Sequence, residues 1–119
     1  PIFDRNQGEI ARTAAATTQA KDIAQQASDQ VMTDVGTAFA AVRQGSSVVR
    51  LYTSGYRQQA KQALDIRQYA YQKGASSLLD LLDAERTYRN TELGYRQALA
   101  AYMLAVEQLK EAVGTRSLP

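Results

Sequence analysis

The sequence predicts an all-α fold: a long antiparallel helical hairpin, coiled-coil-like, that turns at about Gly74. Three observations support this fold class. The 119-residue chain has only two prolines, Pro1 and Pro119, so no interior residue forbids a helix. Alanine, glutamine, arginine and leucine, which are good helix formers, are common throughout. Apolar and small residues recur at three- and four-residue spacing on both sides of Gly74, which is typical of helices that pack along one face.

The first arm of the hairpin is expected over about residues 5–72, after an extended start at residues 1–3. Asp4 is the expected N-cap, in a capping-box arrangement with Gln7. The predicted inward stripe is rich in small residues, which lets two helix backbones approach closely. Its members are Ile10, Ala14, Thr17, Ala20, Ala24, Ala27, Val31, Val35, Ala38, Val42, Val49, Tyr52, Tyr56, Ala60, Ala63, Ile66 and Ala70.

Three glycine-containing places could interrupt this first arm: Gly36, the run 44–47 around Gly45, and the run 53–55 that ends in Gly55. A long packed helix tolerates one glycine, which costs about 1 kcal/mol relative to alanine. The run at Gly45 is the strongest candidate for a break. A break there would give an alternative fold, a three-helix bundle over about residues 5–44, 48–73 and 77–113.

The turn and the start of the second arm carry the most informative stretch of the chain. Lys73 and Gly74 are typical of a helix C-terminus, because glycine adopts the left-handed conformation that closes a helix. Ser77 followed by Asp80 predicts a capping box. Asp83 lies three residues further on, so the two aspartates share one helix face.

The return helix is expected over about residues 77–113, with Lys110 in its last turn, Gly114 just beyond it and a loose tail over residues 115–119. We expect Glu85 and Glu92 to form exposed intrahelical ion pairs with neighbouring arginines: Arg86, Arg89 and Arg96. The predicted inward residues of this helix are Leu78, Leu81, Tyr88, Tyr95, Leu99, Tyr102, Val106, Leu109 and Val113.

Composition excludes several function classes. The net charge of +2 comes from well-mixed acids and bases, without the clustered basic face of a nucleic-acid-binding protein. The absence of cysteine and histidine disfavours a zinc or copper site, and no apolar run has the length of a membrane-spanning helix. No base or nucleophile accompanies the aspartates, so we expect neither an enzyme nor a cofactor. The seven tyrosines lie at spacings that favour helix packing over nucleobase stacking.

The two predicted arms differ in length. At about 1.5 Å per residue, an unbroken first helix would extend roughly 100 Å and the return helix about 55 Å. The return helix would then pair only with about residues 36–72, which leaves the N-terminal half of the first arm without a partner. We therefore interpret residues 1–119 as a single helical segment of a larger protomer.

Three segments resemble TolC-type outer-membrane efflux proteins, and the cobalt–zinc–cadmium resistance branch most of all. Residues 1–10 (PIFDRNQGEI) resemble the segment that follows the last barrel strand, residues 71–84 (YQKGASSLLDLLDA) the periplasmic tip turn of the second repeat, and residues 112–114 the close of its returning helix. The resemblance implies that this chain is the C-terminal periplasmic helical repeat of an outer-membrane channel in a Gram-negative bacterium. Such channels are trimers and form the passive exit duct of a tripartite pump for metal ions or drugs.

The resemblance also implies partners and roles for residues near the tip. The partners would be a periplasmic adaptor and an inner-membrane transporter, and the membrane would be contacted only through barrel strands outside this chain. Asp80 and Asp83 correspond to acidic residues that ring the periplasmic entrance and select cations. Tyr71 corresponds to a tyrosine that latches the closed tip, whereas Ser76 stands where a latching arginine can occur. The tip turn and adaptor contact would comprise Gly74, Ala75, Ser76, Ser77 and Leu79.

Simpler interpretations of the same residues stay open. Asp80 can serve only as a capping residue, and Asp83 only as a solvated acid near the positive end of a helix. The whole chain can be a stand-alone helical interaction module. A membrane-surface helix fits less well, because it needs a basic face opposite a bulky apolar one.

Overall fold

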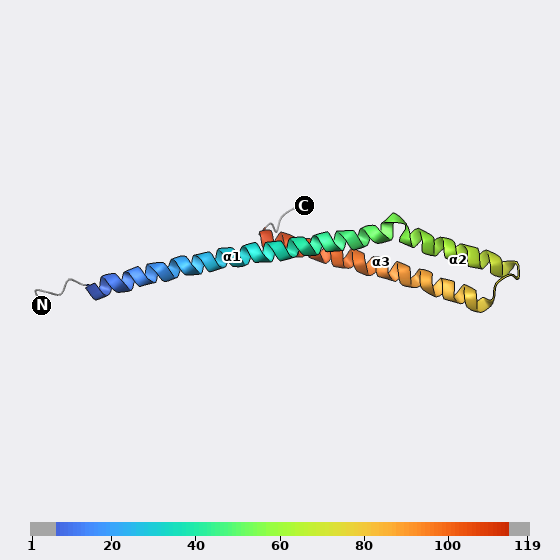
Figure 1. Ribbon diagram of the computed structural model, residues 1–119, viewed down its shortest axis with the longest axis horizontal. Helices are drawn as coiled ribbons and strands as arrows, with labels where there is room; N and C mark the ends of the chain where they lie inside the picture. The colour runs from blue at the N-terminus through green and yellow to red at the C-terminus, as the bar shows by residue number, and fades with distance from the viewer. Residues whose placement is uncertain (1–6, 115–119) are drawn as a thin grey trace, which may run out of the picture. The chain divides into compact units, whose positions relative to one another are not determined.

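The computed structural model describes residues 7–114, and within that range it contains helices and turns but no strand. The elements in chain order are α1 (Gln7–Leu51), a π-helical turn η1 (Tyr52–Tyr56), α2 (Arg57–Gln72) and α3 (Leu78–Val113). The prediction of an all-α hairpin that turns at Gly74 is confirmed (Figure 1). The predicted N-cap at Asp4 and the predicted tail over residues 115–119 lie outside the described residues.

The chain divides into two compact units, residues 1–37 and residues 38–119. The described part of the first unit, residues 7–37, is a stretch of α1 that buries no side chain. Its polar side chains bond along the helix: the Thr13 hydroxyl donates to the Glu9 carbonyl at 2.8 Å, and the Gln25 amide to Asp29 at 2.9 Å. Its large apolar residues Ile10, Ile23, Val31 and Met32 are exposed. The predicted stripe therefore has no second helix within this unit to cover it.

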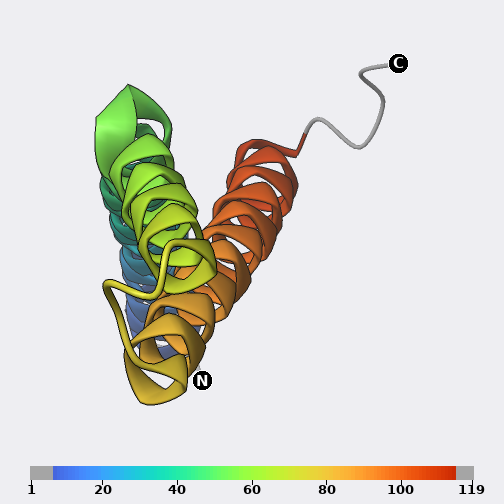
Figure 2. The same cartoon turned by 90° about the vertical axis from the view of Figure 1, so that its right-hand side faces the viewer.

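The second unit is the hairpin. Both views show α2 and α3 side by side, joined by the tip turn (Figures 1 and 2). Most predicted inward residues of the return helix are half-buried as expected, but Leu78 and Val113, at its two ends, are more than half exposed. Among residues 7–114 only Thr91 and Ala105 are buried, with 6% and 7% of their surface exposed. The interface between the two arms therefore consists mainly of half-buried side chains, as expected when two helices pack without a third.

The predicted break at Gly45 is wrong. Helix α1 continues through both Gly36 and Gly45. Gly45 serves close packing, because a Cβ there would lie 3.1 Å from the Cα of Tyr102 on α3. The three-helix bundle that a break at Gly45 would have produced is therefore excluded.

The interruption lies at η1, the third of the places that the sequence indicated. Gly55 has φ 146° and ψ −17°, outside the helical region, and the Arg57 N–H bonds to the Tyr52 carbonyl, five residues back. This π-type turn contains one more residue than an α-helical turn, so the following residues rotate about the axis. Arg57 and Leu64 consequently face inward. Of the residues predicted to face inward after the turn, Ala60 and Ala70 are half-buried as expected, whereas Tyr56, Ala63 and Ile66 are exposed.

Candidate functional site

The tip turn closes α2 with a Schellman motif. Gly74 adopts φ 74°, in the left-handed region that favours glycine. Its N–H donates to the Tyr71 carbonyl at 2.9 Å, and the Ala75 N–H donates to the Ala70 carbonyl at 2.8 Å. These two bonds satisfy carbonyls that the end of a helix would leave unpaired. The predicted turn chemistry of Lys73 and Gly74 therefore holds the reversal in place.

A complete capping box opens α3 at Ser77. The Ser77 Oγ accepts a hydrogen bond from the Asp80 N–H at 3.2 Å, and the Asp80 carboxylate accepts from the Ser77 N–H at 3.2 Å. The same carboxylate oxygen, Oδ2, also accepts from the hydroxyls of Ser77 at 2.8 Å and Ser76 at 3.3 Å. These bonds favour the ionised form, so the pKa of Asp80 is lowered, chiefly by the Ser77 side chain and then by the Ser77 backbone.

The two aspartates share a groove but have different surroundings. Asp80 and Asp83 line a hollow of about 170 Å³ between α2 and α3, opposite Arg67. The charge of Arg67 contributes to lowering the pKa of Asp80. The Asp80 carboxylate is occupied by the cap, whereas Asp83 has no hydrogen bond or ion pair with any residue in the described range 7–114. Of the predicted acidic pair, Asp83 is therefore the carboxylate available to an outside ion.

The other predicted tip residues are exposed to solvent to different degrees. Leu79 is 75% exposed and Tyr71 is 42% exposed. Within the described part of the chain, Tyr71 forms no ring contact, and its backbone carbonyl supports the turn. Ser76, at the position of a latching arginine in the resemblance, instead contributes its hydroxyl to Asp80. The isolated hairpin therefore orders its tip through the cap and leaves both Leu79 and the Tyr71 ring accessible.

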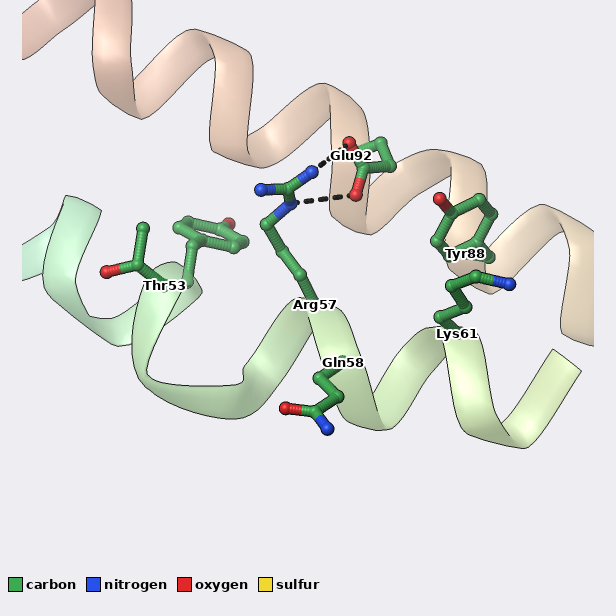
Figure 3. A pocket seen from close by; sticks show the side chains of 7 residues that line it. Thr53, Arg57, Gln58, Lys61, Tyr88 and Glu92 are labelled. Atoms are coloured by element: carbon green, nitrogen blue, oxygen red, sulfur yellow. Dashed lines mark hydrogen bonds and ion pairs between the residues drawn. The ribbon is translucent and has the colours of Figure 1, made fainter. Parts of the chain in front are cut away.

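A second polar cluster, which the sequence interpretation missed, lies beside η1. The Arg57 guanidinium on α2 binds the Glu92 carboxylate on α3 through two bonds, Nε to Oε1 at 2.8 Å and Nη2 to Oε2 at 2.9 Å (Figure 3). The Glu92 side chain is only 19% exposed. The Arg57 bonds lower the pKa of Glu92 and raise that of Arg57, while partial burial opposes both shifts. This ion pair joins the two arms of the hairpin, α2 and α3.

Aromatic rings complete this second cluster. The Arg57 guanidinium lies 4.2 Å from the centre of the Tyr95 ring, a cation–π geometry. Tyr52 contacts Tyr56 edge-on, with ring centres 5.6 Å apart, and lies 6.2 Å from Tyr95. Gly94 makes room for Tyr52, since a Cβ at Gly94 would lie 2.5 Å from the Tyr52 hydroxyl. The irregular turn is thus fastened to α3 by packing as well as by charge.

The sequence interpretation assigned Glu92 to an intrahelical pair, and this is wrong. Of the expected intrahelical pairs, Glu85–Arg89 forms, at 3.1 Å. Glu92 turns toward Arg57 because the extra residue in η1 brings Arg57 onto the inner face of α2. A polar residue in the apolar stripe of α3 was the available signal for a charged partner on the opposite arm. The inward position of that partner, Arg57, could not be derived without knowing that the extra residue in η1 rotates the following residues of α2.

Two further hollows flank the seam. One, of about 460 Å³, contains the ion pair, and Figure 3 shows its labelled walls, with Lys61 beside Tyr88 and Gln58 turned away. The other, of about 320 Å³, is lined mostly by small apolar side chains from α1 and α3, including Gly45, Ala101 and Ala105. Within the described range, no three His, Cys, Asp or Glu side chains gather as a metal site would require. The grooves along the two helices therefore offer surfaces for other helices, and the groove beside Asp83 offers a carboxylate for ions.

Comparisons with known proteins add no relative. No family model, curated protein or solved structure matches this chain. Searching residues 7–114 for a helix with the length and hydropathy to cross a membrane also finds none. The resemblance to TolC-type proteins therefore stays a prediction from the residues that carry it.

Proposed function

We propose that this chain is the periplasmic helical hairpin of a TolC-type outer-membrane efflux channel. In that role it is a structural wall of the exit duct and carries out no chemistry. Three protomers surround the conduit, and an adaptor and an inner-membrane transporter supply substrate and energy. Metal ions or drugs are the proposed cargo.

The geometry of the tip is the observation that supports this proposal best. A Schellman motif and a capping box reverse the chain within a few residues and present Asp83 and Leu79 together near the end of the hairpin. A duct entrance needs such an end, one that is locally rigid and bears ionisable groups. The exposed apolar stripe of residues 7–37 also fits this role, because neighbouring helices of a barrel would cover it.

Within this proposal the two aspartates have different tasks. Asp80 holds the start of α3 through Ser76 and Ser77, and so fixes the direction of the first helical turn. Asp83, one turn further, supplies the carboxylate that ions meet. Three copies of Asp83 around a threefold axis would attract cations and repel anions. The exposed Leu79 and the turn at Gly74 and Ala75 would contact the adaptor.

The test uses the full-length channel in lipid bilayers. We expect Asp83→Asn to reduce cation selectivity and weaken block by trivalent cations. We expect Asp80→Asn to act less on ions and more on the thermal stability of the tip. Asp65→Asn is the matched control, because Asp65 is an exposed acid on α2 that pairs with Lys61 within the same helix.

Unchanged selectivity and unchanged block in Asp83→Asn would contradict the acidic-entrance role. A full-length protein that inserts into no bilayer and forms no trimer would contradict the channel proposal itself. That second result would favour the alternative, a stand-alone helical interaction module, for which the small-residue groove of α1 and α3 offers a surface.

A further inference from the structure

Residues 56–70 carry two apolar stripes that differ by one position. The inward stripe of the structure starts with Arg57 and includes Leu64. The other stripe, with Tyr56 and Ile66, points outward, and its members are 51% and 67% exposed. One residue corresponds to a rotation of about 100° around a helix axis. Either stripe would therefore face α3 after a rotation of about one residue.

The π-turn η1 decides which stripe faces α3. Tyr52 has the last half-buried side chain before Gly55, and Arg57 has the next one after it, a separation of five positions. A regular α-helix would bring Tyr56 inward instead, because inward residues recur every three or four positions. The extra residue is accommodated at Gly55, whose φ of 146° disfavours any other residue type.

Reshaping η1 exposes no unsatisfied buried group. The Thr53 hydroxyl donates to the carbonyls of Val49 and Arg50 at 3.2 Å each, and the Ser54 hydroxyl donates to that of Leu51 at 3.2 Å. Both hydroxyl residues are exposed, so water can replace their bonds when the turn changes. The backbone can consequently exchange a π-turn for an α-turn at low cost.

Opposing interactions favour the two arrangements. The present one is stabilised by the two-bond Arg57–Glu92 pair, by Tyr95 beneath the guanidinium, and by Tyr52 against Gly94. The rotated arrangement would cover the exposed Tyr56 and Ile66 and would return Gly55 to helical φ and ψ angles. Burial of large apolar side chains is favourable, so the unused stripe competes with the clamp.

We infer that η1 is a register switch, with the Arg57–Glu92 pair as the clamp that selects the present register. Releasing the clamp rotates residues 56–72 by about one position, so that Ile66 turns toward α3 and Leu64 turns away. The face that α2 presents to other helices thereby changes from apolar to one that includes Arg57. Such a rotation is a discrete two-state change, of the kind that packed helix interfaces undergo.

The chain has no cysteine, so a single introduced thiol can report each face. The measurement is the labelling rate of Leu64→Cys and, separately, of Ile66→Cys, each in the otherwise unchanged chain and together with Glu92→Gln. In the unchanged chain we expect the thiol at position 66 to react faster. With Glu92→Gln we expect the order to reverse. The rate at position 64 should rise about tenfold, because the rotated register, populated to about 10% in the unchanged chain, becomes the major one.

A second variant and a control complete the test. Deletion of Gly55 removes the extra residue and places Arg57 four positions after Tyr52, so a regular α-helix keeps Arg57 inward. The deletion should therefore retain the original order even when it is combined with Glu92→Gln. Glu85→Gln, which removes an exposed pair on the same helix, should leave the original order. Reactivity that keeps its original order in Glu92→Gln, with helix content retained by circular dichroism, overturns the inference. Equal acceleration at both positions also overturns it, because that result means local unfolding rather than rotation.

Discussion

The tip turn and the π-turn each contain a glycine with positive φ, but different interactions stabilise them. At the tip, Gly74 is held by hydrogen bonds between residues no more than five positions apart, such as Ala75 to Ala70. At η1, Gly55 lies between helices that are fastened to α3 by the Arg57–Glu92 pair, whose members are 35 positions apart. The tip turn is therefore encoded locally, whereas the π-turn depends on the opposite arm.

This difference explains why the sequence located one turn and misplaced the other. Turn residues and caps act through neighbours in the chain, so their residue types are sufficient to identify them. A glycine inside a helix has several possible uses, among them a kink, a close helix contact and an extra residue. Gly45 and Gly55 look equivalent in sequence, and only the position of α3 distinguishes them.

The largest effect that would test this comparison is expected from filling the space opposite the π-turn. Gly94→Leu should lower the free energy of unfolding by about 2 kcal/mol, since overpacking costs up to ~3 kcal/mol and replacing a helical glycine returns about 1 kcal/mol. The added side chain would displace Tyr52, whose hydroxyl lies 2.5 Å from the position of the new Cβ. Urea unfolding followed by circular dichroism measures this change.

Gly36→Leu is the matched control for that variant. A Cβ at Gly36 meets no atom within 4 Å, so the substitution should raise stability by about 0.8 kcal/mol through helix propensity alone. Equal effects at Gly36 and Gly94 would show that packing against α3 does not support the π-turn, and the contrast between the two turns would then be lost.

A smaller effect is expected at the tip. Gly74→Val should cost about 1–2 kcal/mol, the penalty of a left-handed conformation for a residue with a Cβ. A Cβ at Gly74 would meet no atom within 4 Å, so the cost comes from the left-handed conformation, with φ 74°, and not from a lack of space. Gly74→Asn should lose much less, because asparagine tolerates this conformation. A loss from Asn as large as that from Val would indicate that the conformation of residue 74 is not what closes α2.

The smallest effect is expected from acidification. The pKa values of Asp80 and Glu92 are both lowered in the folded state, so their contributions are fully present above the pKa values of the unfolded chain, about 3.9 and 4.3. Stability should therefore fall as pH decreases below about 4, through the folded-state pKa values. Urea midpoints measured across this range report the fall.

Two variants assign this pH dependence to its sources. Ser77→Ala removes the principal cause of the Asp80 shift, and Glu92→Gln removes the titrating group of the clamp. Each should reduce the slope of stability against pH in that window, one through the tip turn and the other through the π-turn. A slope that neither substitution changes would contradict the assignment to these two carboxylates.

The sequence by itself determined the helical class, the reversal at Gly74, the capping box at Ser77 and most inward positions of α3. Each of these follows from helix periodicity or from contacts within a few residues. The tertiary structure decided the continuity of α1 through Gly45, the π-turn at Gly55, the inward position of Arg57 and its pairing with Glu92. These features depend on where α3 lies. The periodicity of one helix cannot reveal an extra residue that is stabilised only by contacts with the opposite arm.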